Sequence, residues 1–168
     1  KDAATFTGSE CLPWAGGLTG ELEGTAYAIQ GNLLVGRAVI EAMEAAFVAG
    51  ADQPFTRRLV AALLAGDEAG GDARGRQSAA LYAVAPRAGY DRSGVLADLR
   101  VDDHEQAPQE LARIHDLHDL YFGGPEGVQP LLDALEREVR AALDGLGFVG
   151  GSTAADLERR IGVGNLET

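Results

Sequence analysis

The sequence has little cysteine, an acidic rather than a basic excess, and no long apolar run. Cys11 is its single cysteine, which excludes an internal disulfide and a cysteine-based metal cluster. The formal net charge of -12 argues against nucleic acid and anionic membranes as partners, because phosphate groups are bound by basic patches. The longest apolar stretches, such as residues 59–65, are far too short to span a bilayer. No basic and apolar signal peptide opens the chain, so we expect a cytoplasmic protein.

The residues that are present suit a folded domain with strands and helices. Apolar residues make up 46% and charged residues 24% of 168 residues, which is ordinary globular composition. Alternating apolar residues predict strands over residues 3–11, 25–34, 78–85 and 95–102. Helical spacing predicts helices over residues 37–49, 108–121, 131–146 and 153–161, and a further helix capped by Asp52. We therefore expect an α+β fold, with a layered domain over residues 1–124 and a helical module over residues 125–168.

Two of these elements have a predicted buried face. In the strand over residues 95–102, one face carries Val95, Ala97, Leu99 and Val101, and the other carries Asp98, Arg100 and Asp102. The helix over residues 108–121 is expected to bury Leu111, Ile114, Leu117 and Tyr121. Ser152 or Thr153 is expected to cap the final helix.

The first candidate site is a pair of amides at the end of a predicted strand. Gln30 and Asn32 project from one face because strand side chains alternate, and Gly31 between them allows a close approach. Two neutral amides could orient a substrate carbonyl or donate hydrogen bonds to an oxyanion. Alternatively, both amides are buried and bond to neighbouring backbone groups.

The second candidate site follows a glycine-rich loop. Arg76, Gln77 and Ser78 stand directly before a predicted strand, and a guanidinium can bind a carboxylate through two hydrogen bonds. An ordinary surface arginine on a solvated loop is the alternative. The loop lacks the lysine and hydroxyl residue that end a P-loop, so phosphate binding is not indicated.

The third candidate site lies where the predicted strand over residues 95–102 ends. Asp102, Asp103 and His104 could act as an acid–base group, or could ligate a metal together with His115 and His118. A turn with a structural histidine is the alternative. We expect no metal site here, because a metal normally needs three or four ligands gathered in space.

Six short motifs occur in one order: FTGS at 6–9, CLPWAG at 11–16, YAIQGN at 27–32, GRQSAA at 75–80, DLRVDDH at 98–104 and DLHDLYF at 116–122. Through these motifs, residues 1 to 123 resemble the family called domain of unknown function 1028, which is placed in the Ntn (N-terminal nucleophile) hydrolase superfamily. The resemblance implies part of a four-layer αββα sandwich and hydrolysis of an amide-type bond. We expect a small-molecule substrate and no cofactor.

The resemblance also implies that the nucleophile lies outside this chain. Members of the superfamily attack with the first residue of the mature chain, whose α-amino group is the base. Lys1 carries neither a hydroxyl nor a thiol, so we expect the family's N-terminal segment to precede it. Many relatives carry a histidine near position 17, where this chain has Gly17.

The C-terminal residues carry a second resemblance. VRAAL at 139–143, LGF at 146–148 and IGVGNLE at 161–167 are similar to a peptidoglycan-binding module that follows this domain in some relatives. A helical packing or dimerisation arm is the alternative, and we expect a homo-oligomer.

Three functional hypotheses follow. In the leading one, an amide hydrolase, Asn32 with Gln30 stabilises the oxyanion, and Arg76 or Arg100 binds a substrate carboxylate. Gln77 and Ser78 help Arg76 to bind this carboxylate, and Asp102, Asp103 and His104 shape the edge of the site. The second hypothesis is a non-catalytic protein whose helical tail contacts peptidoglycan or a partner subunit. The third is a metal hydrolase that uses the Asp102–His104 cluster.

Overall fold

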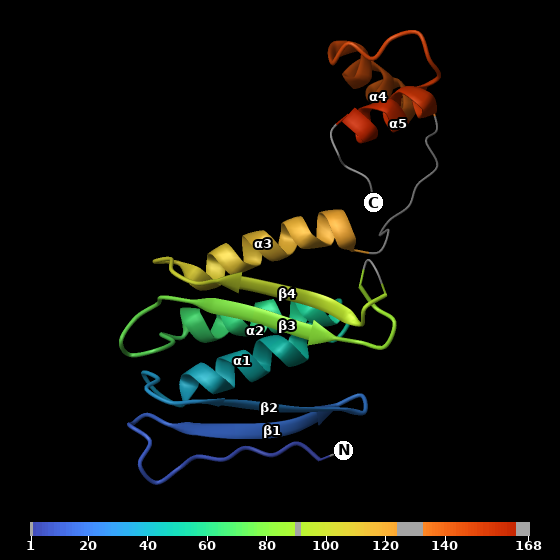
Figure 1. Ribbon diagram of the computed structural model, residues 1–168. Coiled ribbons are helices and arrows are strands. Elements are labelled where there is room, and N and C mark those ends of the chain that lie inside the picture. The colour runs from blue at the N-terminus through green and yellow to red at the C-terminus, as the bar shows by residue number, and fades with distance from the viewer. Residues whose placement is uncertain (1, 90–91, 124–132, 164–168) are drawn as a thin grey trace. The chain divides into compact units, whose positions relative to one another are not determined.

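The computed structural model describes residues 2–89, 92–123 and 133–163. These residues form a mixed α+β structure, with five helices and two antiparallel two-stranded sheets (Figure 1). Contacts divide the chain into two compact units, Lys1–His118 and Asp119–Thr168. Both sheets lie in the first unit.

The first sheet is a hairpin of β1 (Gly16–Leu22) and β2 (Thr25–Gly31). Its two-residue turn, Glu23-Gly24, has positive φ at both positions, 51° and 79°, as a tight hairpin turn requires. The strand predicted over residues 3–11 is wrong, since the described residues before Gly16 form no strand, and β1 was not predicted. β1 was not predicted because it is rich in glycine, and glycine adds no side chain to an alternating apolar pattern. A Cβ at Gly20 would overlap the ring of its cross-strand partner Tyr27, so an aromatic ring occupies the space of a side chain.

Two helices follow, α1 (Ala38–Ala49) and α2 (Phe55–Glu68), which pack against each other, and α1 also packs against this hairpin. The helix predicted over residues 37–49 is confirmed by α1. The two helices approach closely at Gly66, where an added Cβ would lie 2.7 Å from Met43 Cγ. The predicted Asp52 cap is wrong, because Pro54 occupies the cap position and no side chain caps the helix. Asp52 instead lies inside a turn closed by the Gln53 N–H and the Gly50 carbonyl oxygen (2.9 Å).

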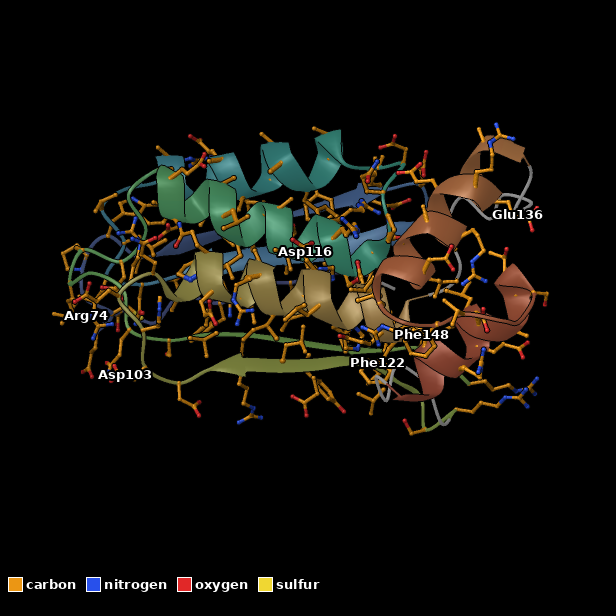
Figure 2. All side chains as sticks on the ribbon, turned by 90° about the horizontal axis from the view of Figure 1, so that it is seen from above. Arg74, Asp103, Asp116, Phe122, Glu136 and Phe148 are labelled. Carbon is orange, nitrogen blue, oxygen red and sulfur yellow. The ribbon has the colours of Figure 1, made fainter. Side chains whose placement is uncertain are left out.

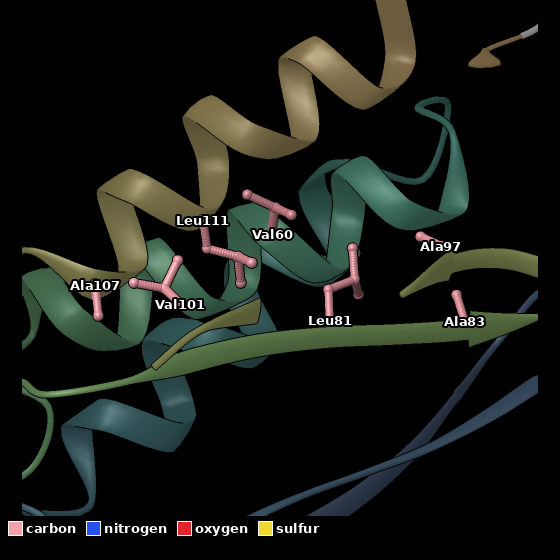
Figure 3. Packing of buried hydrophobic residues seen from close by; sticks show 7 residues of the cluster. All are labelled: Val60, Leu81, Ala83, Ala97, Val101, Ala107 and Leu111. Carbon is pink, nitrogen blue, oxygen red and sulfur yellow. The ribbon is translucent and has the colours of Figure 1, made fainter. Parts of the chain in front are cut away.

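The second sheet is a hairpin of β3 (Ala79–Val84) and β4 (Val95–Val101), followed by α3 (Ala107–Phe122). One face of this hairpin packs on α2 and α3, and this core is shown in Figure 3. Its buried members are Val60, Leu81, Ala83, Ala97, Val101, Ala107 and Leu111. The predicted alternation is confirmed, because Ala97 and Val101 are buried while Asp98 and Arg100 are exposed.

The buried face of α3 differs from the prediction. Leu111 is buried, but Leu117 and Tyr121 are 42% and 38% exposed, and His115 is buried instead. The observed face follows a spacing of four residues through Ala107, Leu111 and His115. Because successive helix residues turn by about 100°, Leu117 lies about 120° around the helix from Leu111.

In the second unit, α4 (Asp133–Gly145) and α5 (Thr153–Val163) pack against each other. The predicted cap is confirmed, since Ser152 Oγ accepts the N–H of Ala155 at 3.2 Å. Residues 131 and 132 of the predicted helix lie outside the described residues. Asp156 is fully buried and binds both Arg140 (2.6 Å) and Arg159.

The LGF motif forms the end of α4. Gly147 has φ of +85° and donates its N–H to Asp144, and the Phe148 N–H reaches back to the carbonyl oxygen of Leu143 at 2.9 Å. This pair of bonds is a Schellman cap, which accounts for the glycine between two apolar residues.

Candidate functional site

A cavity of about 530 Å³ lies in the first unit, where β2, α1, α2 and the loop before β3 meet. Figure 2 marks this end of the unit by Arg74 and Asp103. Its apolar wall consists of Leu34, Val39, Met43 and Leu63. Its polar wall includes Gln30, Asp67, Asp72, Arg74, Arg76, Gln77 and Ser78. The cavity therefore suits a small molecule with one apolar and one polar part.

The glycine-rich loop after α2 is held in place by backbone hydrogen bonds. Gly71, with φ of +55°, donates to the Gly66 carbonyl oxygen and accepts the N–H of Val35, both at 3.0 Å. The Ala73 N–H donates to Leu33 at 2.7 Å. The loop is thus joined to the segment that follows β2, and this contact brings Arg74 and Arg76 to the cavity.

Asp67, in the last turn of α2, is the centre of the polar wall. It is 8% exposed and accepts hydrogen bonds from Arg76 Nε at 2.5 Å and Gln109 Nε2 at 2.7 Å. Burial alone would raise the pKa of Asp67, but the bonds from Arg76 and Gln109 outweigh burial and hold this pKa below its ordinary value. Asp67 is therefore ionised at neutral pH and fixes the guanidinium of Arg76, whose side chain remains 46% exposed.

A second ion pair lies beside the first. Arg74 binds Asp72 through Nε (2.9 Å) and Nη2 (2.7 Å), and the Arg74 N–H also donates to Asp72. The side-chain bond from Arg74 is the main reason that the pKa of Asp72 falls to about 2. This pair is solvated, so it shapes the loop more than it stabilises the fold.

Four of the nine predicted site residues line the cavity together: Gln30, Arg76, Gln77 and Ser78. Asn32 lies instead in a smaller hollow of about 280 Å³, which Gln30 also lines, together with Phe6 and Cys11. The Oε1 atom of Gln30 accepts the N–H of Phe6 at 3.4 Å. Gln30 therefore lies between the two hollows, and its carbonyl oxygen bonds to backbone.

The cluster at residues 102–104 forms the turn between β4 and α3. His104 donates its N–H to the Gln77 carbonyl oxygen at 2.9 Å, and its Nδ1 accepts the N–H of Gln106 at 3.0 Å. The bond from His104 to Gln77 places the turn with Asp102 and Asp103 next to the polar wall of the cavity.

Arg100 and the possible metal-binding group do not line this cavity. Arg100 is exposed on the outer face of β4, 3.8 Å from Asp98, and it does not line the cavity. Within the described ranges, no group of three or more histidine, cysteine, aspartate or glutamate side chains is placed to hold a metal ion. The proposed grouping of Asp102, His104, His115 and His118 therefore does not form.

Four residues of the polar wall and its support were not predicted from the sequence: Asp67, Gln109, Asp72 and Arg74. One signal was present for Asp67, which is an acidic residue at the end of an otherwise apolar helix stripe, directly before the glycine-rich loop. Nothing in the sequence identifies Gln109 as its partner 42 residues away.

Comparison with known proteins gives one family and one solved structure. No curated protein matches the chain. The crystal structure of protein SPO2555 from Silicibacter pomeroyi, described with the family model DUF1028, is similar with 32% sequence identity and a TM-score of 0.56. The similarity covers 68% of this chain and 46% of that one, so the chain spans less than half the length of this relative.

The structure adds one observation on membranes. Among the residues that it describes, none of the helices combines the length and apolar character needed to cross a bilayer.

The model of the family of unknown function DUF1028 matches residues 1–111, which contain both hairpins and the polar wall around Asp67 and Arg76. The chain belongs to the DUF1028 family.

Proposed function

We propose that the cavity binds the carboxylate of a small-molecule substrate, and that this chain is the substrate-binding part of an Ntn-type amide hydrolase whose nucleophile lies outside residues 1–168. One observation carries the proposal. The guanidinium of Arg76 is fixed by a buried carboxylate in the polar wall of a cavity whose other wall is apolar.

The geometry of Arg76 suits an anionic ligand. Of the three guanidinium nitrogens of Arg76, only Nε donates to Asp67, and the described residues give the two terminal nitrogens no hydrogen bond. Two parallel N–H groups match the two oxygens of a carboxylate. Gln77 and Ser78 line the same wall and can bond to neutral polar groups, while Val39 and Met43 offer apolar contact.

The hydrolytic part of the proposal is supported by the motifs shared with the family. In an Ntn mechanism, the nucleophile adds to the amide carbonyl while its own α-amino group takes its proton. The C–N bond then breaks and the amine leaves with this proton, and water later hydrolyses the acyl-enzyme to release the acid and the free nucleophile. Asn32 and Gln30 are the amides available to stabilise the developing oxyanion. Asp102, Asp103 and His104 border the carboxylate-binding wall.

Substrate binding can be tested on the chain alone. We expect N-acyl and N-carbamoyl amino acids to bind in calorimetry, and their neutral C-terminal amides to bind at least tenfold more weakly, because only the acids pair with Arg76. Arg76→Gln should remove this preference. Arg113→Gln is the matched control, since Arg113 also pairs with a carboxylate, that of Glu110, but lies outside the cavity. Equal affinity for acids and amides would refute the binding role.

Hydrolysis requires a longer protein. We expect the gene product that includes the nucleophile-bearing segment to hydrolyse these amides, and to lose activity when its first mature residue is changed. Hydrolysis that survives this change contradicts the Ntn mechanism, even if carboxylates bind at Arg76.

A second candidate function concerns the helical unit. Leu146 and Val149 flank the cap of α4 and are 60% and 64% exposed, which would suit contact with peptidoglycan or a partner subunit. The full chain should then be retained on insoluble peptidoglycan, and Leu146→Ser should reduce retention. Val84→Ser, at a site 61% exposed in the other unit, is the control. Retention that is equal for both variants argues against this role.

A further inference from the structure

The packing of α1 on α2 forms part of the apolar wall of the cavity. Met43 of α1 and Gly66 of α2 both line the cavity, and they contact each other. A Cβ added at Gly66 would lie 2.7 Å from Met43 Cγ and 2.9 Å from Met43 Sδ, which is closer than a normal van der Waals contact. The methionine therefore fills the space that a side chain at position 66 would need, and the glycine determines how far Met43 extends into the cavity.

Met43 is the adjustable part of this wall. Val39, one turn earlier on α1, is 2% exposed, and its Cγ1 would lie 3.6 Å from the same added Cβ, which is an ordinary contact. Val39 is β-branched and stiff about its side-chain torsion, whereas a methionine has three rotatable side-chain bonds. A change at position 43 or 66 should therefore alter the cavity through the Met43 side chain and leave Val39 in place.

The carboxylate anchor and this apolar contact lie on consecutive residues of α2. Asp67 follows Gly66 directly and binds Arg76 Nε at 2.5 Å. Consecutive Cα atoms are about 3.8 Å apart, so the helix fixes a short separation between the apolar contact and the residue that holds Arg76. A ligand that pairs with Arg76 thus meets the apolar wall close to its carboxyl group, rather than at the far end of a long molecule.

We infer that the cavity selects carboxylates with an aliphatic side chain close to the carboxyl group, as in N-acyl amino acids, and that Met43 sets the length of the side chain that fits. The inference rests on the proposed function, because it takes Arg76 as the carboxylate site. It adds the class of substrate and the residue that limits it. Met43 contacts the apolar part of the ligand and takes no part in the reaction.

The test measures the affinity of the 168-residue chain for a series of N-acetyl amino acids by calorimetry. The series consists of the derivatives of alanine, 2-aminobutyrate, norvaline, norleucine, 2-aminoheptanoate and 2-aminooctanoate, in which each member has one more methylene group than the last. Each methylene group that becomes buried should strengthen binding by about fourfold, and the gain should stop where the side chain reaches Met43. The longest side chain that still gains affinity is the length limit of the cavity.

Two substitutions should move this length limit in opposite directions. Met43→Ala removes the side chain beyond Cβ, so the limit should become longer by about two methylene groups. Gly66→Ala adds a methyl group that displaces Met43 into the cavity, so the limit should become shorter by about one methylene group. Val48→Ala is the matched control, since Val48 also lies on α1, is 39% exposed and does not line the cavity. Far-UV circular dichroism verifies that each variant folds, and Met43→Ala alone decides the question if Gly66→Ala does not fold.

A purely structural role of Met43 would weaken the binding of every ligand alike and leave the length limit unchanged. The inference is overturned if the original chain shows no length limit within the series, if Met43→Ala leaves the limit unchanged, if Gly66→Ala lengthens it, or if Val48→Ala shifts it as much as Met43→Ala. In each of these cases the Arg76-dependent preference for acids over amides can persist, and the proposed carboxylate site then stands. Equal binding of acids and amides, with a length limit that Met43→Ala still moves, refutes the proposed function instead.

Discussion

Substitution of Asp67 by asparagine tests the centre of the candidate site. The change keeps the size of the side chain and one acceptor oxygen, but it removes the charge that pairs with Arg76. Asp67 accepts two hydrogen bonds, from Arg76 at 2.5 Å and from Gln109 at 2.7 Å, and is itself only 8% exposed. The amide can satisfy one of these donors and turns its own N–H₂ group toward the other.

The expected loss of stability follows from these contacts. A hydrogen bond to a charged group contributes about 1.5–3 kcal/mol, which sets the upper limit for losing the Arg76 pairing. Arg76 is 46% exposed and can bond to water once its partner is gone, which lowers the cost. We therefore expect Asp67→Asn to reduce the free energy of unfolding by about 2 kcal/mol at pH 7.

The pH dependence gives a second, independent readout. Because the pKa of Asp67 is lower in the folded chain than in the unfolded chain, ionised Asp67 stabilises the fold above the ordinary aspartate pKa. This contribution is lost as pH falls through the folded pKa. The difference in free energy of unfolding between the original chain and Asp67→Asn should thus be constant from about pH 5 to 8 and shrink below about pH 4.

Urea unfolding, followed by fluorescence, measures both quantities. Trp14 is the single tryptophan and lies in the first unit, where its backbone pairs with Leu34. Asp98→Asn is the control, since its side chain is 52% exposed and 3.8 Å from Arg100, and it should change stability by less than about 0.5 kcal/mol. Equal losses for the two variants, or a difference that grows as the solution is acidified, would refute the reasoning.

Three further predictions concern other parts of the chain. Leu111→Ala should reduce the free energy of unfolding, measured in urea, by about 2–5 kcal/mol because Leu111 is fully buried. Val84→Ala, at a position 61% exposed, should reduce it by less than about 0.5 kcal/mol, and similar losses for the two variants would contradict the assigned core. Gly20→Val should destabilise the first unit by about 1–3 kcal/mol, since its side chain must displace the ring of Tyr27, and an unchanged midpoint would exclude this packing. Hydrogen bonds from two arginines lower the pKa of Asp156, so its ionised carboxylate stabilises the fold near neutral pH. Asp156→Asn should therefore reduce the helical circular dichroism signal near neutral pH but not below about pH 3, and a reduction seen only in acid would contradict this reasoning.

The helices and the second hairpin were predictable because their signals are local. Apolar residues recur at helical spacing through α1, and charged and apolar residues alternate through β4 from Val95 to Val101. Each pattern is complete within one element, so no knowledge of its neighbours is needed. Arg76, Gln77 and Ser78 were also found from a local feature, the glycine-rich lead into β3.

The remaining features depend on contacts between distant residues. β1 has few apolar side chains of its own, and its strand geometry relies on Tyr27 covering Gly20 from the opposite strand. The rotation of the buried face of α3 toward His115 depends on how the helix lies against the β3–β4 hairpin. Asp67 and Gln109 meet only after the whole unit has folded, so sequence spacing could not identify them as partners.

The carboxylate of Asp67 joins three separate segments: the end of α2, the loop that carries Arg76, and the first turns of α3 through Gln109. Any ligand that binds the guanidinium of Arg76 will add a second anion to the same cation. The binding free energy of this ligand is then coupled to the free energy of the Asp67–Arg76 ion pair, and each changes the other by an equal amount. A substitution at Gln109, which does not line the cavity, should for this reason change ligand affinity.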